Sequence, residues 1–174
     1  MDLQGYWEKG RSFEAFVANA APEHRMLWDG IYRTARVPAW AAGQLAEPRR
    51  LLVLAEDWCA DTSSTVPVLA RWTEQAAGLS LRVLRRDENP ELMNRYLTLG
   101  TRSIPVVIVL DEEGQELGHW GPYPAPLAEW VQGHKPPALS KDEFVKGKRT
   151  WHARDRGETM LRELAPLVIG VGVG

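Results

Sequence analysis

The pattern of apolar and polar positions divides the chain into three parts. Residues 1–49 are expected to form a helical extension that packs on the core, with helix starts at Ser12 and Pro22. Residues 50–132 alternate strand and helix signals and form the main domain. Residues 133–174 predict a linker and a long polar helix, whose charges of both signs are typical of a solvated face. We therefore expect an α/β domain with a helical extension at each end.

The main domain contains four short segments that predict strands. These are Leu51–Ala55, Leu81–Leu84, Val106–Leu110 and Gln115–Trp120. The first is apolar throughout, as in a strand buried on both faces, and a helix with an apolar stripe follows it. A start signal at Asn89-Pro90-Glu91 predicts a second helix that runs to Gly100, and a last helix is expected at about Pro126–Val131. This order predicts a central mixed β-sheet flanked by helices.

Composition and charge exclude several classes of partner. The 174 residues include 21 Lys+Arg and 23 Asp+Glu, which gives a formal net charge of −2. This balance gives no electrostatic basis for nucleic-acid binding, and no apolar run reaches the roughly 18–20 residues of a membrane span. The N-terminus has no basic segment leading into an apolar one, so no secretory signal is visible. We expect a cytoplasmic protein with neither nucleic acid nor membrane among its partners.

Cys59 is the single cysteine, which excludes an internal disulfide and a cysteine-rich zinc site. It follows the first predicted strand and precedes a helix, so we expect it at or just before a helix N-terminus. Unpaired backbone N–H groups and the helix dipole favour a thiolate there, which is the reactive form of cysteine. The alternative is a buried, unreactive thiol, but the polar residues on both sides favour a functional one.

The other candidate sites are weaker. The four histidines, His24, His119, His134 and His152, have no metal-ligand spacing, and none is near Cys59 in sequence. A Cys–His hydrolytic pair stays conceivable, because such partners meet in space rather than in sequence, but nothing selects one. The glycine-rich tail, 168–174, lacks the lysine and the context of a phosphate loop and is expected to fray. We expect no metal and no other cofactor.

Four motifs occur in the order and spacing of the thioredoxin superfamily, which the chain resembles over about half of its length. They are Trp58-Cys59-Ala60-Asp61-Thr62, Pro67 eight positions beyond the cysteine, Asp87-Glu88-Asn89-Pro90, and Gly100-Thr101-Arg102-Ser103-Ile104-Pro105. More narrowly, the sequence is similar to bacterial thioredoxin-like proteins with a lone active-site cysteine behind an N-terminal helical extension. The resemblance implies a thioredoxin-like fold in which a cis-proline at position 105 faces the cysteine.

The resemblance also implies roles for the site residues. Cys59 is the expected nucleophile. Trp58, Ile104 and Pro105 are expected to shape the groove that binds the substrate, with the Ile104 backbone pairing with an extended segment. Thr62 stands where thioredoxins have their resolving cysteine. Its hydroxyl can still donate a hydrogen bond to the sulfur, so Thr62 is the second expected catalytic residue.

Further residues near the motif bear on the reactivity of the thiol. Val53 stands where thioredoxins have a buried aspartate that assists the resolving step, which argues against a dithiol reductase. Glu56, Asp57 and Asp61 place negative charge near the thiol and would raise its pKa. The helix terminus and Arg102 act in the opposite direction. The sequence leaves the sign of the net shift open.

We therefore predict a monothiol thiol–disulfide oxidoreductase. Cys59 attacks a disulfide-containing protein or the disulfide of a low-molecular-weight thiol, and an external thiol resolves the intermediate. The alternative keeps the fold without the reaction, as an inactive thioredoxin-like binding module that uses the same groove for a protein partner. A high pKa of Cys59, together with no adduct on exposure to a disulfide, would favour this alternative. The sequence leaves open whether the flanking helices cover the groove or build a homodimer.

Overall fold

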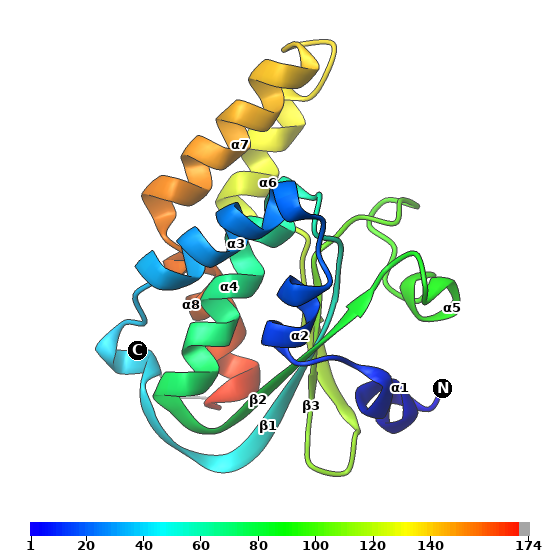
Figure 1. Cartoon of the computed structure of the whole chain (residues 1–174), viewed down its shortest axis with the longest axis vertical. Helices are drawn as coiled ribbons and strands as arrows, with labels where there is room; N and C mark the ends of the chain where they lie inside the picture. The colour runs from blue at the N-terminus through cyan, green and yellow to red at the C-terminus, as the bar shows by residue number, and fades with distance from the viewer. Residues whose placement is uncertain (171–174) are drawn as a thin grey trace.

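The computed structural model describes residues 1–170 and contains a four-stranded sheet in the order β2-β1-β3-β4 (Figure 1). The strands are β1 (Gly43–Ala55), β2 (Ala76–Arg85), β3 (Val106–Leu110) and β4 (Glu116–Trp120). β1 and β2 are parallel and are joined by helix α4 (Ala60–Gln75), whereas β3 pairs antiparallel with both β1 and β4. The predicted mixed sheet is confirmed.

β1 is a central strand, and its second half runs directly into the candidate site. Leu51–Ala55 is fully buried, because β2 and β3 pair with its two edges and helices cover its two faces. The strand begins at Gly43, well before the predicted start at Leu51. The first two residues of β1 pair with the start of β2, and the register then shifts before Arg49. This leading part is mostly exposed, so its apolar pattern did not reveal it.

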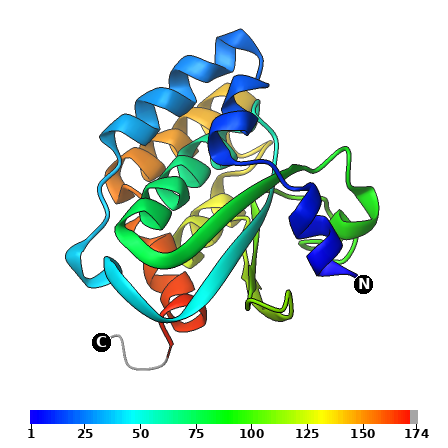
Figure 2. The same cartoon turned by 60° about the horizontal axis from the view of Figure 1, so that its bottom comes forward.

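Helices cover both faces of the sheet (Figure 2). One face carries α2 (Phe13–Ala18), α3 (Pro22–Thr34), α4 and α8 (Glu158–Val168), and the other carries α1 (Leu3–Lys9) and α5 (Pro90–Met93). Trp28 and Trp72 are fully buried in the larger core, and Trp7 lies in the smaller one. Ser12 caps α2 and α3 begins at Pro22, as predicted, and a short 3-10 turn, η1 (Ala39–Ala41), precedes β1. No described helix combines the length and the hydropathy needed to cross a bilayer.

The helix predicted to run to Gly100 is much shorter in the structure. α5 spans only Pro90–Met93, and the chain then turns. Thr98 and Thr101 exchange two backbone hydrogen bonds of 2.9 Å, with Leu99 and Gly100 at φ values of 49° and 77° between them. These left-handed conformations are incompatible with a helix that reaches Gly100. The loop that precedes β3 follows this turn directly.

The C-terminal part forms three helices, α6 (Ala125–His134), α7 (Lys141–Asp155) and α8 (Glu158–Val168). The predicted helix near Pro126 is confirmed as α6, and Ser140 caps α7 through a capping box with Glu143. The long polar helix expected after Ser140 is confirmed as α7, but Arg156 and Gly157 adopt left-handed conformations that end it, and the further helix α8 was not predicted. α8 then buries its apolar side in the larger core. Fraying was expected over 168–174, but Val168 ends α8 with its side chain buried, and residues 171–174 lie outside the described residues.

Candidate active site

Cys59 is the N-cap residue of α4 and directly follows the loop that ends β1. Its side chain is partly buried, and the thiol donates a hydrogen bond to the Ile104 carbonyl oxygen, with 3.8 Å between sulfur and oxygen. The peptide bond between Ile104 and Pro105 is cis. The fold thus brings the cysteine motif and the proline loop together, although 45 residues separate Cys59 from Ile104.

The residues expected to shape a substrate groove present different groups to the surface. The Trp58 side chain is 51% exposed, and the Arg86 guanidinium lies 5.1 Å from the centre of its ring. Ile104 packs its side chain into the smaller core, so its backbone is the part next to the thiol. Arg102 donates from Nε to the Asn94 side chain at 2.9 Å. Arg102 is therefore engaged by a neighbour other than the thiol.

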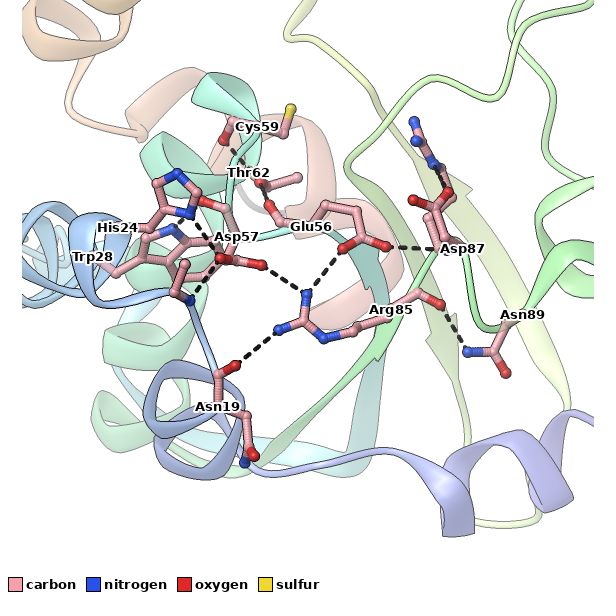
Figure 3. Close-up of polar contacts among 12 residues, drawn as sticks. Asn19, His24, Trp28, Glu56, Asp57, Cys59, Thr62, Arg85, Asp87 and Asn89 are labelled. Atoms are coloured by element: carbon pink, nitrogen blue, oxygen red, sulfur yellow. Dashed lines mark hydrogen bonds and ion pairs between the residues drawn. The ribbon is translucent and has the colours of Figure 1, made fainter.

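Thr62 is fully buried one turn into α4. Its hydroxyl donates to backbone carbonyls in the loop before the helix, those of Glu56 and, at 2.9 Å, of Cys59. Both the backbone N–H and the hydroxyl of Thr62 also lower the pKa of the Cys59 thiol. Thr62 thus links the loop after β1 to the first turn of α4 and lies between Cys59 and Glu56 (Figure 3).

The pKa of the Cys59 thiol is raised above its ordinary value. Burial is the main cause, and the negative charge of Asp61 adds to it. Hydrogen bonds from the Thr62 and Asp61 N–H groups and from the Thr62 hydroxyl lower the pKa, but they do not outweigh burial. The thiol is therefore mostly protonated at neutral pH.

Asp61 joins the cysteine segment to the C-terminal part of the chain. Its carboxylate accepts from Lys148 Nζ at 2.7 Å and lies 3.0 Å from His152 Nε2, and all three side chains are buried. Sequence reasoning missed Lys148 and His152, because the mixed charges of α7 suggested a solvated helix. Their spacing of four, which places both on one helix face, is the signal that points to a shared partner.

Tyr123, which follows β4, extends this cluster. The Lys148 ammonium lies 5.5 Å from the centre of the Tyr123 ring. Burial raises the pKa of Tyr123, and the negative charges of Asp61 and of a Cys59 thiolate add to the effect. Burial lowers the pKa of Lys148, but Asp61 raises it by more, so the ammonium stays charged. Lys148 is thus a buried cation close to the thiol.

Unlike Asp61, which contacts α7, Asp57 faces the N-terminal helices (Figure 3). Its carboxylate accepts from Arg85 at 2.7 Å, from the Ala21 N–H at 3.0 Å, and lies 2.7 Å from His24 Nδ1. Arg85 also donates to the buried Glu56 carboxylate at 2.9 Å. Burial alone would raise the pKa of Asp57, but the hydrogen bonds from Arg85 and His24 hold it well below its usual range. Its charge is therefore compensated within this cluster.

No histidine in residues 1–170 is hydrogen-bonded to the Cys59 thiol. His24 and His152 contact aspartates, His119 contacts Glu116, and His134 contacts a backbone carbonyl. Within the same range, no cluster of three or more His, Cys, Asp or Glu side chains is suited to a metal ion. The geometry supports a lone thiol rather than a Cys–His hydrolytic pair.

Comparisons with known proteins agree with this arrangement. The model of a family described as Thioredoxin matches residues 10–140, which is most of the chain. A crystal structure of a protein of unknown function from Pseudomonas aeruginosa is 20% identical, with a TM-score of 0.67 over 91% of this chain and 95% of that one. An HIV epitope scaffold is 19% identical, with a TM-score of 0.65 over 87% and 96% of the two chains. No curated protein matches the chain. The chain belongs to the thioredoxin family.

Proposed function

We propose that the protein is a monothiol thiol–disulfide oxidoreductase whose nucleophile is Cys59. The observation that carries the proposal is the position of its sulfur, at the N-terminus of α4 and 3.8 Å from the Ile104 carbonyl oxygen. Thr62, in the place of a second cysteine, leaves the chain without an internal thiol that could release a bound product. Family membership supports the fold and this general class of chemistry.

The proposed reaction has two exchange steps. The Cys59 thiol first loses its proton to solvent, and the thiolate attacks one sulfur of a substrate disulfide. A new disulfide forms between Cys59 and one half of the substrate, and the other half leaves as a thiolate. An external thiolate then attacks the substrate-derived sulfur of this mixed disulfide, which forms a disulfide between the external thiol and that half of the substrate and releases Cys59 as a thiolate.

The surface around the sulfur suits an extended or small disulfide substrate. Trp58 offers an exposed apolar face, and the backbone before Pro105 lies against the thiol. The proposed substrates are a disulfide-containing protein or the disulfide of a low-molecular-weight thiol. Because resolution needs a plentiful external thiol, we place the reaction in the cytoplasm, where such thiols are kept reduced.

A second candidate function is favoured by the raised pKa of Cys59. A thiol that is mostly protonated at neutral pH is a weak nucleophile. The same groove would then serve as a binding module for a protein partner, without covalent chemistry. The two functions differ in whether Cys59 ever forms a covalent adduct with a disulfide.

Mass spectrometry of the intact chain separates the two functions. The chain is incubated with oxidised glutathione between neutral pH and about pH 9.5, which is above the ordinary thiol pKa. The oxidoreductase gains the mass of one glutathionyl group on Cys59, gains it faster as pH rises, and loses it on addition of reduced glutathione. Cys59→Ser is the matched control and gains nothing. If the wild-type chain stays unmodified even at the highest pH, the binding module replaces the oxidoreductase.

A further inference from the structure

A cavity of about 520 Å³ lies between α3, α4 and α7. The three helices run side by side on the same side of the sheet in both views (Figures 1 and 2). The volume is in the range of small-molecule sites in proteins. Cys59 does not line this cavity, and the first turn of α4 contributes Ser63 and Ser64 instead. The cavity is thus distinct from the groove around the thiol.

The walls of the cavity are largely apolar. Leu27 and Ile31 come from α3, Val68 from α4 and Ala153 from α7. Leu27 is 37% exposed, although it is a large apolar side chain. Covering such side chains with an apolar group would be favourable by about 25 cal/mol for each Å² removed from water. The walls therefore suit a ligand with an apolar body.

The charged groups at the cavity are all basic. Arg149 and Arg156 line it, together with His152, and no acidic side chain is among the described residues that do so. Both arginines are exposed, and neither belongs to any ion pair within residues 1–170. Two uncompensated guanidinium groups beside one cavity favour an anion.

The other side of α7 shows that this one-sign arrangement is not a general property of the helix. A second groove there is lined by the basic residues Lys146 and Arg154 but also by Glu143 and Asp155. Charges of both signs offset one another in that groove. Of these two sites, only the cavity that faces α3 and α4 is lined by basic residues without an acidic one.

From the apolar walls and the two free arginines, we propose that this cavity binds a small amphipathic anion. The ligand has an apolar body, which lies against Leu27, Ile31 and Val68, and one carboxylate or sulfonate group, which pairs with Arg149 and Arg156. This site is independent of the proposed thiol chemistry. It would exist equally in an oxidoreductase or in a binding module.

Fluorescence titration of the full chain with anilinonaphthalene sulfonate tests the proposal. This probe joins an apolar ring system to one sulfonate, and N-phenylnaphthylamine is its neutral counterpart. We expect saturable binding of the sulfonate probe at one site and its displacement by decanoate. Arg149→Gln and Arg156→Gln should each weaken binding of the sulfonate probe by about threefold and leave binding of the neutral probe unchanged.

Two further variants distinguish this site from general surface binding. Arg154→Gln removes the same charge on the opposite side of α7 and should leave both affinities unchanged. Ala153→Trp fills the cavity from its exposed rim and should abolish binding of both probes, with the fold checked by circular dichroism. Absence of saturable binding overturns the proposal. So does equal weakening by Arg154→Gln and the two cavity arginine variants, or full binding by a folded Ala153→Trp protein.

Discussion

At the residue scale, the protonation of Cys59 depends on two opposing effects. The helix N-terminus favours a thiolate by about 0.3–1 kcal/mol when it is exposed. Burial and the nearby Asp61 carboxylate favour the neutral thiol, and the net pKa is raised. Burial can shift the pKa of a group by several units, so it outweighs the helix terminus here. The position of the sulfur at a helix N-terminus favours the thiolate, whereas burial keeps the thiol protonated until the pH rises.

The raised pKa predicts the pH dependence of Cys59 alkylation. Because the thiolate is the reactive form, the rate with iodoacetamide should rise with pH, with a midpoint above the roughly 8.5 of a free thiol. The measurement is the second-order rate constant across the pH range, with a short unfolded cysteine peptide as the reference. A midpoint below that of the peptide would contradict the burial effect.

Removing the Thr62 hydroxyl should affect both stability and reactivity. Thr62→Val removes one of two donors to the buried Glu56 carbonyl and leaves the Cys59 N–H at 3.3 Å, so it should cost about 0.5–1.5 kcal/mol of unfolding free energy. The same change should raise the pKa of Cys59 further, because the hydroxyl lowers it. Urea unfolding and the alkylation profile measure the two effects. Thr62→Ser keeps the hydroxyl and should stay close to wild type in both.

At the element scale, α7 supplies Lys148, the buried cation that pairs with Asp61. Removing this cation should change the pKa of the Cys59 thiol. Lys148→Met removes the ammonium beside the Asp61 carboxylate, which keeps only its contact with His152, so the pKa of Cys59 should rise and its alkylation at neutral pH should slow. Breaking a buried pair in this way should also cost about 3–5 kcal/mol of stability. Asp61→Asn should act in the opposite direction on the thiol and lower its pKa.

Lys146 provides the matched control for this prediction. It lies on the same helix, is exposed, and forms none of the ion pairs found in residues 1–170. Lys146→Met should therefore leave both the stability and the alkylation profile unchanged. If Lys148→Met and Asp61→Asn shift the pKa of Cys59 in the same direction, the electrostatic account of this cluster is wrong.

β2 contributes Arg85, which pairs with the two carboxylates that precede Cys59, those of Glu56 and Asp57. Arg85→Met leaves the Glu56 and Asp57 carboxylates buried without their shared guanidinium, which should cost about 3–5 kcal/mol. Chemical denaturation at neutral pH measures this loss. Arg86→Met is the neighbouring control, because the Asp87 side chain with which Arg86 pairs is 60% exposed and the pair should contribute less than about 1 kcal/mol. A similar loss in both variants would refute a special role for the buried pair.

The sequence pattern correctly predicted those helix and strand features that neighbouring residues in the sequence determine. The apolar run of β1, the Ser12 cap and the proline at the start of α3 are each decided by a few neighbouring residues. The sequence pattern did not predict features that depend on contacts between residues far apart in the chain. Lys148 is buried because Asp61 lies opposite it, 87 residues away, and nothing in the composition of α7 reveals that contact. A helix that runs to Gly100, as predicted, is likewise prevented by the left-handed conformations of Leu99 and Gly100.

In the candidate site, too, the short motifs could be predicted from the sequence, whereas the partners of the charged residues could not. The cysteine motif and the proline loop were found from short motifs, because each motif lies within a few consecutive residues. Asp57 and Asp61 were both expected to act on the thiol, yet the structure gives them different partners. Asp57 is neutralised by Arg85 and His24, whereas Asp61 acts on the thiol and is itself paired with α7. Sequence showed the charges but not which way they face.

At the scale of the whole molecule, stability should fall in acid. The folded-state pKa of Asp57 lies well below the roughly 3.9 of an unfolded aspartate, so its contribution is present above that pH. It is lost as the pH falls below about 4, because the unfolded chain takes up a proton that the folded one resists. Urea unfolding at neutral pH and near pH 3 measures the loss, which should be smaller in Arg85→Met. An equal loss in both proteins would show that other groups cause it.

The short segment from Glu56 to Asp61 is held from both ends of the polypeptide at once. His24, from near the start of the chain, contacts Asp57, and Lys148, from near its end, contacts Asp61. A fragment of residues 50–132 would keep the pair between Arg85 and Asp57, but it would leave Asp57 without His24 and Asp61 without its buried cation, Lys148. The two flanks thus hold the loop that carries Cys59 from both sides, and removing either one should loosen that loop.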